Sequence, residues 1–183
     1  LGVRLLTTED GEEARAIAAQ LSQLNEERRA IEAAVQEAAE AQLHTQHNRA
    51  VVVVAGHGWH PGVIGIVAGR IKEKTGKPAL VIALDADEDT GHGKGSGRSI
   101  TGVDLGAAII EARERGLLVA GGGHAMAAGL TIESGKLNAL ADFLDERLGR
   151  AVATAQAQQS LLLDLSIAPR GLNPALVESL ESA

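Results

Sequence analysis

Cysteine is absent from the 183-residue sequence, and aromatic side chains are nearly absent, because there is one Trp, one Phe and no Tyr. The lack of cysteine excludes disulfides, thiolate nucleophiles and Cys-ligated zinc or iron–sulfur sites, and it fits a reducing, cytoplasmic compartment. The scarcity of aromatic rings argues against a module that stacks several nucleic-acid bases. Apolar runs are far shorter than the ~20 residues that span a bilayer, and the first ten residues show no signal-peptide pattern, so we expect no membrane partner.

Positive charge is also in short supply, and the formal net charge is −7 at pH 7. Domains that hold nucleic acid by diffuse electrostatics are usually basic, so that mode of binding is not expected. A small cationic cluster can still bind phosphate on an acidic body. The acidic residues crowd the N-terminal part, whereas the middle of the chain is richer in Gly and His.

A long helix is predicted from about residue 10 to residue 43, because this stretch contains no proline and only Gly11 near its start. Residues 7–10 (TTED) supply a cap and first-turn acids. Apolar residues recur every three or four positions in a narrow stripe. About 35 residues would reach ~50 Å. A coiled-coil seam and a helix bridging two domains both fit, and the lack of large residues in the stripe favours the bridge.

The pattern after residue 48 predicts an α/β domain. Buried strands are expected at residues 50–55, 79–84 and 127–132, and helices at residues 61–74, 103–115 and 137–157. The polar stretch 85–95 reads as a surface loop or hairpin tip. Strands that alternate with helices favour a mixed, largely parallel sheet flanked by helices. Residues 160–167 (SLLLDLSI) resemble the opening strand of a further domain, followed by a short helix.

Glycine-rich segments that also carry His or Arg occur at residues 56–62, 65–70, 95–99 and 121–124. Glycines at strand ends let backbone N–H groups approach an anion, and His and Arg there add charge-assisted donors. Together they predict a phosphate site, although a glycine triplet is more often a tight turn. Trp59, beside His60, is either a packing residue over the sheet end or one wall of a binding groove.

Two other chemistries are weakly supported. His44 with His47, and His57 with His60, have H-x-x-H spacing but lack a carboxylate at helical spacing, so no metal site is expected. Ser96, His124 and Asp104 are the residue types of a serine hydrolase, but Ser96 lacks the G-x-S-x-G turn.

Three motifs in order carry a family resemblance: HGWHPGVIGIVAGRIKEKTGKPALVIAL, GKGSGRSITGVDLGAAI and GGGHAMAAGLTI. They resemble the DHHA1 domain of the RecJ family of 5′-to-3′ single-stranded-DNA exonucleases over roughly residues 50–133. The resemblance implies a linker helix (residues 1–48) from a DHH domain, a DHHA1 domain (49–158) and the start of an oligonucleotide-binding domain (159–183). No Asp-His-His occurs in the sequence.

The same resemblance implies roles for individual residues. His124 would be the catalytic histidine that faces the phosphate. The residues that match the family's phosphate-contact motifs are Arg70, Ser96, Arg98, Ser99, Gly122, Gly123 and His124. Trp59 and His60 would line the groove. Two Mn²⁺ or Mg²⁺ ions would be held by the DHH domain and none by this chain, so the chain alone would not hydrolyse DNA.

The expected partners are single-stranded DNA and the DHH and C-terminal domains, in a monomeric protein of DNA repair and recombination. A smaller DHH phosphoesterase that acts on short oligonucleotides or cyclic dinucleotides is one alternative. An RNA-binding or association module of the kind found in alanyl-tRNA synthetases is another, and a purely structural dimerisation domain is the third.

Overall fold

The structure is a computed structural model, and it describes residues 1–85, 91–158, 167–168, 171 and 173–181. The helices are α1 (Gly2–Thr7), α2 (Gly11–Ala41), α3 (Ile64–Thr75), α4 (Leu105–Glu114), α5 (Leu137–Ala157) and α6 (Pro174–Glu181), with short 3-10 turns at Leu43–Thr45 and Ser134–Lys136. The strands are β1 (Val52–His57), β2 (Ala79–Leu84), β3 (His92–Arg98), β4 (Ala120–His124) and β5 (Ala127–Glu133). The strand expected at residues 160–167 lies, apart from Ile167, outside the described residues.

The five strands form one mixed sheet in the order β1-β2-β3-β5-β4, which confirms the predicted α/β class. Only β1 and β2 are parallel, and the other three pairs are antiparallel. The expectation of a largely parallel sheet is therefore corrected. A parallel pair needs a long crossover such as α3, whereas the β4–β5 connection is two residues long and permits only an antiparallel hairpin.

Among the strands, β3 and β4 are the two that the sequence pattern did not predict. Gly93, Gly95 and Gly97 of β3 all face the core, where neighbouring leucine side chains leave no space for a Cβ. A Cβ on Gly95 would lie 2.7 Å from Leu130 Cδ1, and one on Gly97 would lie 2.8 Å from Leu105 Cδ2. Glycine is therefore required here by close packing, although glycine normally weakens a strand.

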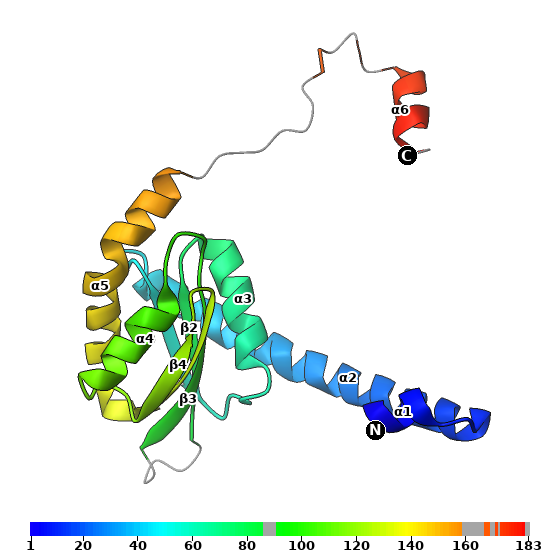
Figure 1. Cartoon of the computed structure of the whole chain (residues 1–183), viewed down its shortest axis with the longest axis horizontal. Helices are drawn as coiled ribbons and strands as arrows, with labels where there is room; N and C mark the ends of the chain where they lie inside the picture. Colours follow the sequence, from blue (N-terminus) through cyan, green and yellow to red (C-terminus); the bar gives the residue numbers. More distant parts are fainter. Residues whose placement is uncertain (86–90, 159–166, 169–170, 172, 182–183) are drawn as a thin grey trace.

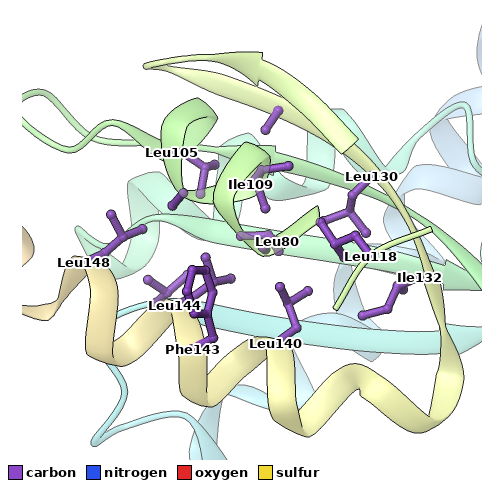
Figure 2. Packing of buried hydrophobic residues seen from close by; sticks show 14 of the residues in the cluster. Leu80, Leu105, Ile109, Leu118, Leu130, Ile132, Leu140, Phe143, Leu144 and Leu148 are labelled. Carbon is purple, nitrogen blue, oxygen red and sulfur yellow. The ribbon is translucent and has the colours of Figure 1, made fainter. Parts of the chain in front are cut away.

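Each face of the sheet has its own hydrophobic core. On one face, α4 and α5 pack against the sheet, with Leu140, Phe143 and Leu144 of α5 directed at Leu80 and Ile109 (Figure 2). On the other face, α2 and α3 cover β1, β2 and β3 through Val35, Val67 and Ile71 among others. The second face is left open over β5 and β4, where Ala120, His124 and Gly129 are exposed.

Helix α2 confirms the predicted long helix and begins at the predicted cap, since the Asp10 carboxylate accepts hydrogen bonds from the N–H groups of Glu12 and Glu13. Its C-terminal end packs on the domain through Val35 and Ala39. Its N-terminal part extends away from the sheet, with α1 alongside it (Figure 1). Within the described part of the chain, no helix has the length and apolar character needed to cross a membrane.

Candidate phosphate-binding site

The strand register brings the polar residues of β3 and β4 to the open face of the sheet. Arg98 pairs with Ala127 of β5, and Ala127 pairs with His124 of β4, so all three lie in one cross-strand row. Residues directly opposite each other in a sheet point to the same face. Arg98 and His124 therefore emerge on the same side, although 26 positions separate them in the sequence.

The next two rows extend this face along β3. Ser96 lies beside Gly129 and then Gly122, and Lys94 lies beside Thr131 and then Ala120. Alternation along the strand places Lys94, Ser96 and Arg98 on one side, at intervals of about 7 Å. We refer to the three rows headed by Lys94, Ser96 and Arg98 as the open strip.

Arg98 is a half-buried cation held by neutral acceptors. Its Nη1 donates to Ser96 Oγ at 3.2 Å and to the Gly97 carbonyl at 2.9 Å. Gly65 of α3 packs against this pair, because a Cβ there would lie 3.1 Å from both Arg98 Nη2 and Ser96 Oγ. No carboxylate among the described residues forms an ion pair with Arg98. Its charge is therefore available to an anion, for which guanidinium is a two-pronged donor.

A hollow of about 480 Å³ lies over the rows of Ser96 and Lys94. Gly122 and Gly129 form part of its floor, and a Cβ on either would meet no atom within 4 Å. Pro61, in the turn before α3, and Ile64, the first residue of α3, line it from the side. The small floor lets a ligand approach the backbone closely.

His124 stands exposed at the end of β4. Its Nδ1 accepts a hydrogen bond from the Met126 N–H at 3.3 Å, so in the neutral ring the proton is on Nε2, which can donate to a ligand. The backbone of His124 rests on Gly106 of α4, where a Cβ would lie 2.8 Å away. Gly123 permits the tight β4–β5 hairpin, since a Cβ there would lie 2.3 Å from the Ala127 carbonyl oxygen.

Two of the residues named from the sequence lie away from this group. Ser99 is buried, and its hydroxyl donates to the Val103 carbonyl at 2.7 Å, which stabilises the turn before α4. Arg70 faces α2, where its guanidinium forms an ion pair with Glu32 and donates to Gln36 Oε1 at 2.5 Å. The structure therefore does not bring Arg70 to the row of Arg98 and His124.

The ion pair of Arg70 joins α3 to α2. Glu32 is 3% exposed, and its other oxygen accepts from Arg28 at 2.5 Å. One helical turn further along α3, Lys74 pairs with Glu40 at 2.5 Å. This seam sets the position of α2 on α3, whose first turn carries Gly65 against Arg98.

Trp59 covers the end of the sheet. A Cβ on Gly56 would lie 2.3 Å from Trp59 Cε2, so the ring occupies the space that a side chain at Gly56 would fill. The indole packs against the core under α2 and α3, as in the packing interpretation. His60 is exposed, and its Nδ1 accepts from the Gly62 N–H at 3.0 Å.

Lys94, Thr131 and Gly129 belong to the open strip but were not identified from the sequence. The spacing Lys94-x-Ser96-x-Arg98 would have indicated Lys94, had residues 92–98 been recognised as a strand. Thr131 and Gly129 are placed beside them only by the pairing of β3 with β5. Among the described residues, no group of three His, Asp or Glu side chains could hold a metal ion.

These features define a DHHA1 domain, and the profile of that domain family matches residues 47–150. The chain belongs to the DHHA1 domain family. It is similar to the single-stranded-DNA-specific exonuclease RecJ of Bacillus subtilis (38% identity, 76% of this chain, 18% of the relative). It is also similar to that of Dickeya dadantii (34% identity, 100% of this chain, 32% of the relative). The resemblance to RecJ is confirmed, and the chain spans a third or less of these relatives.

Solved structures agree with this assignment. RecJ of Thermus thermophilus in complex with Mn²⁺ has a TM-score of 0.69 at 31% identity, over 97% of this chain and 25% of that chain. An exonuclease RecJ bound to manganese has a TM-score of 0.65 at 31% identity, over 88% of this chain and 38% of that chain. The DHHA1-type fold with a long N-terminal helix is thereby confirmed.

Proposed function

We propose that this chain is the substrate-binding DHHA1 portion of a RecJ-like 5′-to-3′ single-stranded-DNA exonuclease of DNA repair and recombination. The observation that carries the proposal is the half-buried Arg98, without an acidic partner among the described residues, in the same row as His124. Partial burial of a charge without a counter-ion costs free energy, and a bound anion would offset that cost. The relatives are single-stranded-DNA-specific exonucleases, which supports single-stranded DNA as the substrate and exonucleolytic hydrolysis as the reaction.

In this proposal the chain binds and orients a phosphodiester. Arg98 and Ser96 hold the non-bridging oxygens, and His124 donates from Nε2, so that fixed donors offset negative charge as the phosphodiester is attacked. Gly122 supplies the close backbone approach. Ser99 stabilises the turn that follows Arg98 through its hydrogen bond to the Val103 carbonyl, and Trp59 packs over the end of the sheet.

A divalent ion, when bound, activates water for attack on phosphorus, and structures of RecJ contain Mn²⁺ or Mg²⁺. The described residues do not fit that ion. In the proposal, a DHH domain holds the ion, and residues 1–48 join that domain to this one. Residues 159–183 begin a further domain. The whole protein is proposed to be monomeric and cytoplasmic.

The test combines binding with hydrolysis. Titration of isotope-labelled chain with a 5′-phosphorylated oligothymidylate should shift the amide signals of β3, β4 and β5, and a duplex of the same length should shift them less. Arg98→Ala should weaken binding, whereas Arg29→Ala removes the same charge from the exposed side of α2 and should not. Incubation of the chain with the single strand and Mn²⁺ should release no nucleotide. Equal binding of Arg98→Ala, or turnover that survives repurification, would contradict the proposal.

A further inference from the structure

We propose that Lys94 forms a second phosphate subsite, so that the open strip binds an extended polynucleotide backbone rather than a single terminal phosphate. The inference rests on the proposed function and deepens it. It concerns the rows of Lys94 and Ser96, which lie beyond the row shared by Arg98 and His124. A ligand of several nucleotides can occupy both subsites, whereas a mononucleotide can occupy only one.

The position of Lys94 supports this assignment. Its side chain lies on the same face of β3 as Arg98, about 13 Å away along the strand, with Ser96 between them. It lines the 480 Å³ hollow. No carboxylate among the described residues forms an ion pair with it, whereas Lys72, Lys74 and Lys136 each have an acidic neighbour.

The surroundings of Lys94 favour a sugar-phosphate backbone over a base. The neighbouring positions on β5 and β4 are Thr131, Ala120, Gly129 and Gly122, which are small and carry no ring. Bases are usually held by stacking on aromatic side chains. A strip with cations along one edge and a small floor suits a chain of phosphates, which cations bind without regard to base sequence.

The hollow begins beside the first subsite, at Ser96, and reaches the second at Lys94. It extends from Ser96 past Gly122 and Gly129 to Lys94, Thr131 and Ala120. Because Ser96 accepts a hydrogen bond from Arg98, a ligand with its first phosphate at Arg98 would lie beside the end of the hollow that leads to Lys94. The Lys94 ammonium offers three donors on a flexible stem, and a passing phosphate can be held without fixed geometry.

The experiment compares two ligands on the whole 183-residue chain. Wild type, Lys94→Gln, Lys94→Arg and Arg98→Ala are titrated with thymidine 5′-monophosphate and with 5′-phosphorylated tetrathymidylate, followed by amide chemical shifts. Lys94→Gln should lower the affinity for the tetranucleotide by about fivefold, the upper range for one exposed charge pair. Its affinity for the mononucleotide should not change. For the tetranucleotide, the slope of log affinity against log salt concentration should be less negative by about 0.7 in this variant, the value for one phosphate contact on a single strand.

The controls make each outcome decisive. Lys94→Arg should keep the tetranucleotide affinity, Arg98→Ala should weaken both ligands, and Arg29→Gln should change neither. If Lys94→Gln alters neither ligand, or weakens both equally, the second subsite is refuted while the phosphate site at Arg98 stands. If the wild type binds neither ligand, the proposed function fails together with the subsite.

Discussion

Arg98 on β3 and His124 on β4 both pair with Ala127 of β5, so their side chains leave the sheet in one row and on one face. Two strand spacings separate their backbones by about 10 Å. Long side chains from both sides can therefore reach one phosphate group that lies over Ala127. The row is the geometric basis for treating the two residues as one site.

The shared row predicts non-additive substitutions. In a longer protein that contains this chain, Arg98→Ala or His124→Ala should each raise the barrier to DNA hydrolysis by about 2–4 kcal/mol, the scale for one transition-state donor. The double variant should cost less than the sum, because residues that act on one group couple. Single-turnover rates measure the effect, with circular dichroism as the control for folding. Strict additivity would indicate two separate sites.

The glycines of the two sheet faces should respond in opposite ways to added side chains. Gly129→Val puts a side chain into open space on the strip, so the melting temperature should stay equal or rise while oligonucleotide binding is lost. Gly95→Ala forces a Cβ against Leu130 and should destabilise the fold by about 1–3 kcal/mol. Thermal unfolding and titration of both variants provide the test. A destabilised Gly129→Val protein would show that the hollow is not free space.

The seam between α2 and α3 should weaken in acid. The hydrogen bond from Lys74, and then that from Gln36, lower the pKa of Glu40 below its ordinary 4.5. A carboxyl with a lowered pKa stabilises the fold above its unfolded pKa, and this contribution is lost as the pH falls through the folded value. The melting temperature of the wild type should therefore be higher than that of Glu40→Gln at pH 7, and this difference should disappear well below pH 4.5.

Glu37→Gln is the matched control for that comparison, because Glu37 is exposed on α2 and forms no ion pair with any described residue. It should show no comparable gap at pH 7. A difference between wild type and Glu40→Gln that persists unchanged into acid would mean that the Glu40 charge does not contribute to docking.

Much of the fold follows from local patterns in the sequence. The continuous proline-free stretch with the Asp10 cap predicted α2, and apolar periodicity predicted β1, β2, β5, α3, α4 and α5 close to their observed bounds. Strands β3 and β4 escaped prediction because glycine has low strand propensity. The glycines of β3 are explained by leucines from other elements, such as Leu130 and Leu105, that the local sequence does not place beside them.

The site divides in the same way. The residue types Ser96, Arg98, Gly122 and His124 and their glycine-rich setting indicated phosphate chemistry from the sequence alone, and their contact with phosphate stays a prediction. Register decided which of them share a face, and it added Lys94, because side-chain direction in a sheet depends on pairing between distant strands. Arg70 acquired a different partner, since Glu32 lies 38 positions earlier and meets it only when α2 docks on α3. The sequence determined the chemistry available to this protein, and the tertiary structure decided which groups act together, because side chains act at distances that only packing creates.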